Sequence, residues 1–490
     1  MGLIGRQSIK STIYIYLGVG AGFILRAKLF PQHLSESEIG ILALLISYGS
    51  IFAQIAILGF NHATIKYFPF FRNPKQGHHG FLLLYLIVAA VGFLLFMGLQ
   101  WLVAEITFTT EVDLFQQYYF LCIPLTASLL LFLVMDNYNT ALYNASTGVF
   151  LREFVLRIVM LGFFMLFIWQ IVDFGSYAYL YIGSFTLIAL LMMAFIIWRG
   201  EFLVKPTPRL WNKTLLKAMA GISFFGLLTG LNNVVILQVN NILIDAYYNE
   251  AMTGIYITNF FFAALILLPS RGLNKIAPTI ISNAFKSRDL DTVHQVHYKS
   301  TINQMVIGLL LFVGLYINLH NVYRILPESY AIGSMVIIYT GMANLVQMLG
   351  GISSSIIGFS DYFRYNTYLT VIQLIILVIL NLLLLPSWGI TGAALATLGA
   401  ILVINVLKFV FLKIKFDIQP YRIKHLLGLI TAAICLGINY FLPELPQLIP
   451  DILMRSAIIT VIYVSLSYLL KISPEMNHAI NKTFEKLRIR

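Results

Sequence analysis

About fourteen apolar stretches of membrane-spanning length follow one another between Ile13 and Leu470, and they constrain the fold more than any other feature. A bilayer core about 30 Å thick is crossed by roughly 20 apolar residues in a helix, so fourteen helices take up about 280 residues. Charged residues make up only 11% of the 490-residue chain, and its mean hydropathy is +0.85. What remains suffices only for short joints. The sequence therefore predicts an all-α integral membrane protein with about fourteen transmembrane helices.

The joints between these stretches alternate between basic and acidic. Basic joints carry Arg6 and Lys10, Lys66, Arg72 and Lys75, Arg199 to Lys217, Arg271 to Lys299, Lys413 to Lys424, and the tail from Lys471 to Arg490. Acidic joints carry Glu36, Glu38, Glu105, Asp173, Glu250, Glu328, Glu444 and Asp451, with Arg324 and Arg455 as exceptions. Because basic joints stay on the cytoplasmic side, both termini are expected there.

The net charge of +12 does not indicate a nucleic-acid binder, because the cations are spread over joints and do not form one basic domain. The two cysteines, Cys122 and Cys435, lie in apolar stretches without ligand-type neighbours, and His78-His79 is expected to be a solvated loop, so no metal site is predicted. No nucleophile with a base and no cofactor motif stands out. The pattern favours a transporter over an enzyme.

The chain contains an internal repeat. Corresponding residues of the two copies are separated by a constant number of positions, which is the separation of Gly40 and Gly254. The same offset aligns Phe71 with Phe285 and Gly175 with Gly389. Internal duplication is typical of transporter folds, where the substrate site lies between the repeats. We expect four parts, namely a first six-helix bundle over residues 1–200, a cytoplasmic linker over 201–214, a second bundle over 215–412, and two further helices with a basic tail over 413–490.

Four cations within or at the ends of apolar stretches are candidates for binding an anion: Arg26, Lys66, Arg157 and Arg271. Arg26 shares a helix face with Gly18 and Gly22, so this face either opens on a cavity or packs as a small-residue motif while the arginine reaches the headgroups. Arg157 has Glu153 as an i,i+4 partner. Lys66 and Arg271 also fit ordinary positive-inside anchors.

One stretch, over about residues 215–247, is rich in amides: Asn233, Gln238, Asn240 and Asn241. Gln238 and Asn241 share one face with Asp245, and Asn233 shares another with Asn240. Each amide offers a donor and an acceptor, which suits a hydroxyl-rich ligand such as a sugar, but helix-to-helix hydrogen bonding is an equal alternative. No acid is expected deep inside an apolar helix.

Several segments resemble bacterial oligosaccharide flippases of the polysaccharide-transport family. The similar segments are Gly5 to Ile13, Leu34 to Gly40, Ile65 to Phe71 and, most specifically, GITGAALAT from Gly389 to Thr397. This family belongs to the superfamily that includes multidrug and toxin extrusion proteins and lipid II flippases. The resemblance covers essentially the whole chain.

The resemblance implies two pseudo-symmetric six-helix bundles around a central cavity, which rock between inward-open and outward-open states. It implies a substrate, an oligosaccharide on undecaprenyl pyrophosphate, moved from the cytoplasmic to the periplasmic leaflet of the bacterial inner membrane for lipopolysaccharide O-antigen or capsule assembly. Membrane lipids, a polysaccharide polymerase and glycosyltransferases are the implied partners. Arg26, Lys66 and Arg271, with Arg157 in addition, would engage the pyrophosphate.

One departure concerns the coupling ion, Na⁺ or H⁺. The family often has an acid in the middle of the seventh helix, where this chain reads Val239-Asn240-Asn241. The alternative functions are a cation-coupled multidrug exporter of the same fold and a membrane polysaccharide polymerase or ligase. The exporter is expected to carry intramembrane acids, and the polymerase a large periplasmic loop.

Overall fold

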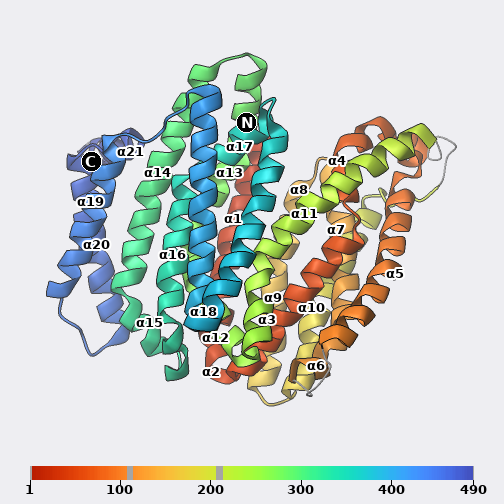
Figure 1. Ribbon diagram of the computed structural model, residues 1–490, viewed down its shortest axis with the longest axis horizontal. Helices are drawn as coiled ribbons and strands as arrows, with labels where there is room; N and C mark the ends of the chain where they lie inside the picture. Colours follow the sequence, from red (N-terminus) through yellow and green to blue (C-terminus); the bar gives the residue numbers. More distant parts are fainter. Residues whose placement is uncertain (1–2, 108–113, 206–212, 489–490) are drawn as a thin grey trace. The chain divides into compact units, whose positions relative to one another are not determined.

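The computed structural model describes residues 3–107, 114–205 and 213–488, and within these ranges every regular element is a helix (Figure 1). Twelve helical segments of the described chain are long and apolar enough to cross a membrane. The expected all-α fold with many crossings is therefore confirmed. The chain divides into two compact units, Met1–Gly254 and Ile255–Arg490.

Two features raise the number of crossings from twelve to the expected fourteen. The first is helix α18 (Phe363–Phe416), whose 54 residues form two helices joined at a kink. Gly389 there has φ +58°, three residues after Pro386, and a β-carbon at Gly392 would lie 2.3 Å from the carbonyl oxygen of Leu384. The two glycines of the GITG segment thus allow the chain to turn back and start the next helix.

The second feature is the run of α8 (Ala145–Val149), η4 (Phe150–Val155) and α9 (Leu156–Ile168). At a rise of 1.5 Å per residue this continuous run is about 36 Å long, which is enough to cross a bilayer core. It contains Arg152 and Arg157, which lower its mean hydropathy.

The first unit contains α1 (Leu3–Phe23), η1 (Ile24–Leu29), α2 (Phe30–His33), α3 (Glu36–Ala56), α4 (Phe60–Phe71), η2 (Pro74–Gly80), α5 (Phe81–Thr107), α6 (Leu114–Tyr118), η3 (Tyr119–Leu121), α7 (Cys122–Ala141), the α8–α9 run, α10 (Phe174–Trp198), α11 (Lys213–Tyr247) and the start of α12 (Glu250–Ala264). Helix α3 lies against α5, α7 and α11, and α1 lies against η4 and α9. Helix α11, which the sequence assigns to the second bundle, groups with the first unit because it also packs against α4. The boundaries that the sequence predicts for the two repeats stay a prediction.

The two glycines that mark the repeat contact each other's helix. A β-carbon at Gly40 would lie 1.9 Å from the carbonyl oxygen of Glu250, and one at Gly254 would lie 1.9 Å from the carbonyl oxygen of Glu36. Glu36 and Glu250 are related by the same repeat offset as the two glycines. The starts of α3 and α12 therefore cross at equivalent positions, backbone against backbone.

Local signals set the beginnings of several helices. Ser35 forms a capping box with Glu38 at the start of α3, where the Ser35 amide donates to the Glu38 carboxylate at 2.8 Å. Asp173 caps α10 by accepting from the amide of Ser176 at 3.1 Å. These caps fix the helix ends nearest the acidic joints.

The expectation that His78 and His79 form a solvated loop is wrong. Both side chains are buried in η2, and the imidazole of His78 lies 2.9 Å from the carboxylate of Glu201. The amide of Asn73 donates to the other ring nitrogen of His78. The contact between His78 and Glu201 therefore joins η2 to the segment that follows α10.

The second unit contains the rest of α12, η6 (Leu265–Leu267), α13 (Leu268–Lys286), α14 (Leu290–Ile317), α15 (Leu319–Ile325), η7 (Glu328–Gly333), α16 (Ser334–Leu349), α17 (Ser353–Phe359), α18, α19 (Ile423–Ile438), η8 (Asn439–Phe441), α20 (Leu448–Leu469) and α21 (Pro474–Arg488). One apolar cluster joins α13, α14, α17 and α18, and a second joins α14, α19 and α20. Helix α14 contributes to both clusters and so lies at the centre of this unit (Figure 1).

A buried charge network holds α20 against α15. Asp451 is fully buried and Arg455 is 2% exposed, and Nε of Arg455 donates to both carboxylate oxygens of Asp451. His320 and Asn321 of α15 also contact the Asp451 carboxylate, at 2.8 Å for His320. Arg455, one of the two cations found in the acidic joints, is thus neutralised by its ion pair with Asp451. The other, Arg324, donates to the carbonyl of Leu445 in the joint before α20.

Candidate functional site

The side chain of Arg157, on α9, packs against the glycine-lined face of the first membrane helix that precedes Arg26. A β-carbon at Gly18 would lie 2.5 Å from Nη1 of Arg157, and one at Gly22 would lie 3.1 Å from its Nε. Arg26 follows Gly22 by four residues, which is about 6 Å along the helix axis. The glycines therefore make room for the Arg157 side chain and place its guanidinium beside the turn that carries Arg26.

Arg157 is held by the helix that carries it. Its Nη1 donates to the carbonyl oxygen of Glu153 at 2.7 Å, and its Nη2 lies 3.0 Å from the Glu153 carboxylate. Both side chains are about one-quarter exposed. The expected i,i+4 ion pair is thus confirmed. It fixes the arginine in place while one side of the guanidinium faces the glycines of α1.

Arg26 is more open than Arg157. Its side chain is exposed, and it comes within hydrogen-bonding reach of Tyr181 on α10. Helix α10 also packs against α9 and η4, so three membrane segments meet around the two arginines. A phenol beside a guanidinium supplies a second polar group at the same depth.

The backbone is irregular on both sides of this arginine pair. Arg26 lies in η1 and Glu153 lies in η4, and both segments are π-helical. Single π-turns inside α-helices are rare and frequently occur at functional sites. Helix α1 links the two π-turns, because it packs against η4 and continues into η1. We take this cluster of Arg26, Arg157, Glu153 and Tyr181, named the arginine cluster below, as the candidate site.

The other two predicted cations lie elsewhere. Lys66 is exposed on α4, with its ammonium 5.8 Å from the ring centre of Tyr67. Helix α4 packs against α11, where His62 lies over Gly226. Arg271 belongs to the second unit and is exposed near the start of α13, after the buried Ser270. Their roles as phosphate ligands stay predictions.

The amides of α11 divide between packing and exposure. Ser47 of α3 donates to the amide oxygen of Gln238 at 2.9 Å and accepts from the amide nitrogen of Asn241 at 3.0 Å. Asn240 is buried, whereas Asn233 is exposed. The alternative of helix-to-helix bonding thus accounts for Gln238 and Asn241. Sugar binding by any of the four stays a prediction.

One acidic residue lies within an apolar helix, near its end and not deep inside it. Asp136 lies in α7, and its Oδ1 is shielded from solvent with no hydrogen-bond partner among the described residues. A β-carbon at Gly148 would lie 1.7 Å from this oxygen, so only a glycine leaves room for it. Asp136 lies in the last two turns of α7, and in the sequence such a position is indistinguishable from a joint.

A buried lysine was also missed. Lys408 in α18 is 8% exposed, and its ammonium donates to the hydroxyl of Ser354 on α17 at 2.9 Å. The charge lies about one turn before Lys413 of the basic joint. Its burial depends on α17, a short helix that the apolar pattern does not predict.

The fold is similar to those of solved transporters. A structure described as the lipid II flippase MurJ in an inward closed conformation matches with a TM-score of 0.74 at 14% identity, over 95% of this chain and 98% of that chain. A transporter of the MOP superfamily from Pyrococcus furiosus, described as having a binding pocket of reversed polarity, matches with a TM-score of 0.57 at 14% identity, over 85% and 95%. A MATE protein in complex with MaL6 matches with a TM-score of 0.56 at 14% identity, over 85% and 97%.

No protein-family model matches the chain, and no curated protein does. The fold is similar to that of solved MOP-superfamily transporters. At 14% identity this likeness extends to the fold alone. Together with the twelve apolar helices of the described chain it indicates a multi-pass membrane protein.

Proposed function

We propose that the protein is a flippase that moves an oligosaccharide on undecaprenyl pyrophosphate from the cytoplasmic to the periplasmic leaflet of a bacterial inner membrane. The observation that carries this proposal is the arginine cluster, in which the guanidinium of Arg157 packs against the glycine-lined face that precedes Arg26, within membrane-spanning helices. The MurJ-like fold supports a transport role. Surface polysaccharide assembly, whether of O-antigen or capsule, is the process this activity would serve.

The physical argument is electrostatic. A charged side chain at the bilayer centre costs roughly 2.5–3.5 kcal/mol by insertion scales, so charges inside membrane helices are rare and tend to mark functional sites. A pyrophosphate carries several charged oxygens that are costly to move through hydrocarbon. Guanidinium groups bind phosphate oxygens in a bidentate manner and keep their charge. In this account Arg26 and Arg157 replace the water that the headgroup loses.

The remaining predicted residues extend this account. Lys66 in the first unit and Arg271 in the second would bind the pyrophosphate as it moves, and Asn233 with Asn240 would meet the sugars. The lipid tail would stay in the bilayer throughout. No covalent chemistry is required, and Na⁺ or H⁺ would supply the driving force.

The crossing of α3 and α12 supports alternating access. At Gly40 and Gly254 the two backbones touch, so this end of the two repeats can close without side chains between them. In parallel repeats the substrate path runs between equivalent helices. We expect this contact to separate when the path opens on that side.

Deleting the gene in its native host tests the proposed function. We expect lipid-linked oligosaccharide to accumulate on the cytoplasmic leaflet and surface polysaccharide to be lost, both restored by the wild-type gene. The matched control is a deletion of the polymerase, which would leave single repeat units on the surface side. Unchanged surface glycan without accumulation of the intermediate would contradict the proposal.

A cation-coupled multidrug exporter is the second candidate, and Asp136 is the observation that favours it. A buried carboxylate in a membrane helix is a default ion or substrate site. Efflux of a cationic dye from cells would distinguish the two. An exporter loses efflux in Asp136→Asn, whereas a flippase that does not use Asp136 keeps polysaccharide transport in that variant.

A further inference from the structure

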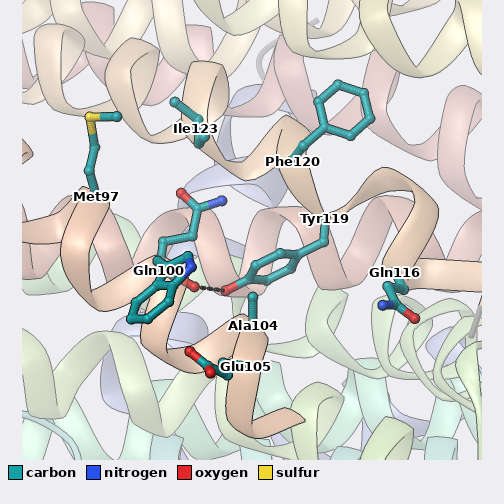
Figure 2. A pocket seen from close by; sticks show the side chains of 9 residues that line it. Met97, Gln100, Ala104, Glu105, Gln116, Tyr119, Phe120 and Ile123 are labelled. Carbon is teal, nitrogen blue, oxygen red and sulfur yellow. Dashed lines mark hydrogen bonds between the residues drawn. The ribbon is translucent and has the colours of Figure 1, made fainter. Parts of the chain in front are cut away.

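A pocket of about 680 Å³ lies within the first unit, where α5 ends and α7 begins (Figure 2). Its floor is a stripe of α5 made of Met97, Gln100 and Ala104, and the opposite wall comes from η3 and the start of α7. The volume is that of a site for a molecule of drug or lipid-headgroup size. The pocket is separate from the arginine cluster, which lies on α1, α9 and α10.

Gln100 gives the pocket its polar centre. The residue is 5% exposed, and its Oε1 has no hydrogen-bond partner among the described residues. Figure 2 shows its amide projecting between Met97 and Tyr119. The hydroxyl of Tyr119 donates to the backbone oxygen of Gln100 at 3.4 Å, so it leaves the side chain unsatisfied. A buried acceptor without a donor is destabilising, and a bound N–H group would remove that cost.

The charge of the pocket is negative. Glu105 is the charged side chain among the described lining residues, and it is exposed one turn beyond Trp101. Gln100 and Glu105 are about 7.5 Å apart along the helix axis and leave different faces of α5 (Figure 2), so a cation beside the Gln100 amide feels Glu105 as a nearby negative charge and not as a direct ligand. Trp101 and Phe120 add aromatic faces, which attract cations. The lining thus selects a cation with N–H donors.

The rim of the pocket is apolar and open. Trp101 is 68% exposed and Phe120 is 50% exposed, and on α5 Leu94 and Leu95 are more than half exposed as well. In a membrane protein such a face borders lipid, and tryptophan near a helix end marks the interface with water. The occupant must therefore carry an apolar tail.

We infer that this pocket binds the ammonium headgroup of a phosphatidylethanolamine molecule from the surrounding leaflet. The ammonium donates to Oε1 of Gln100 while Glu105 supplies a negative charge nearby, and the upper part of an acyl chain lies along Met97, Trp101 and Phe120. Phosphatidylcholine has the same charge and tail but no N–H donor. Phosphatidylglycerol lacks the cation. The bound lipid links the end of α5 to the start of α7.

Thermal unfolding of the purified full-length protein, with each lipid added in turn, tests this inference. We expect phosphatidylethanolamine to raise the unfolding temperature by several degrees more than phosphatidylcholine or phosphatidylglycerol at the same mole fraction. Phosphoethanolamine without a tail should have no effect. Equal stabilisation by phosphatidylcholine, or full stabilisation by phosphoethanolamine alone, would overturn the inference.

Two variants complete the test. Glu105→Gln and Gln100→Leu should abolish the specific effect of phosphatidylethanolamine while leaving the unfolding temperature without added lipid at or above that of the wild type. Glu444→Gln, an exposed carboxylate of the second unit, is the matched control and should keep the effect. If both pocket variants responded to phosphatidylethanolamine as the wild type does, the lipid would bind elsewhere and the assignment would be wrong.

Discussion

Gly40 and Gly254 occupy equivalent positions of the internal repeat, and each touches the backbone of the helix that carries the other. The carbonyl oxygens they meet belong to Glu250 and Glu36, which are related by the same offset. A contact of this kind is what two parallel repeats produce where they cross. It leaves no room for an added atom at Gly40 or at Gly254.

Gly40→Ala and Gly254→Ala should each destabilise this crossing. The new β-carbon would lie 1.9 Å from a carbonyl oxygen, so the helices must separate, at a cost of about 1–3 kcal/mol. The measurement is the unfolding temperature of the purified protein. Gly98→Ala in α5 is the control, because its β-carbon meets nothing within 4 Å and alanine favours a helix. A drop in Gly98→Ala as large as in Gly40→Ala would contradict the assignment.

Two glycines of α1 provide a matched pair for the arginine cluster. Gly18→Ala places a β-carbon 1.9 Å from the carbonyl oxygen of Glu153 and displaces Arg157, whereas Gly20→Ala meets nothing within 4 Å. We expect transport to fall about tenfold or more in Gly18→Ala, which corresponds to one lost charge-assisted bond of about 1.5–3 kcal/mol. Gly20→Ala should behave as the wild type. Restoration of surface polysaccharide in the deletion strain is the readout, and equal activity of the two variants would show that the position of Arg157 does not matter.

Ser47→Ala should weaken the contact between α3 and α11. The serine hydroxyl joins Gln238 and Asn241, and hydrogen bonds between membrane helices contribute about 0.6 kcal/mol each on average. We therefore expect a loss of about 1 kcal/mol in the free energy of unfolding. Ser50→Ala, about one turn along α3, is the control and should cost less. A larger effect on transport than on stability would instead favour the sugar-binding alternative for these amides.

The buried pair of Asp451 and Arg455 should be sensitive to the loss of either partner. Asp451→Asn or Arg455→Met alone leaves an unpaired buried charge, which costs about 3–5 kcal/mol. The double variant Asp451→Asn with Arg455→Met should cost less than the sum of the single variants, because neither partner of the ion pair is then left as an unpaired charge. A double-mutant cycle on the unfolding free energy measures this coupling, and additive effects would refute it.

The helical pattern and the ion pair of Arg157 with Glu153 were predictable because each depends on hydropathy or on spacing along one helix. The GITGAALAT segment likewise indicated a helix start, and the structure shows why, since Gly389 takes a positive φ. A crossing such as the α8–α9 run is recognised in the sequence only if charged residues are allowed within a membrane-spanning segment.

Other features depend on contacts between distant segments and could not be read from the sequence. Oδ1 of Asp136 is shielded because Gly148 of the next crossing lies against it, and Lys408 is buried because α17 covers it. The π-turns at Arg26 and Glu153 have no residue signature of their own. The unsatisfied amide of Gln100 becomes a signal only when its surroundings are known.

Flipping measured in proteoliposomes tests the central claim most directly. Lipid-linked oligosaccharide extracted from the deletion strain would be placed in vesicles with the purified protein, and its arrival in the outer leaflet measured by release with an added glycosidase. We predict that the wild type and Arg199→Ala, an exposed cation at the end of α10, transfer the lipid, that Arg26→Ala and Arg157→Ala each slow transfer at least tenfold, and that Arg26→Lys is intermediate. Wild-type rates in both alanine variants would contradict the account.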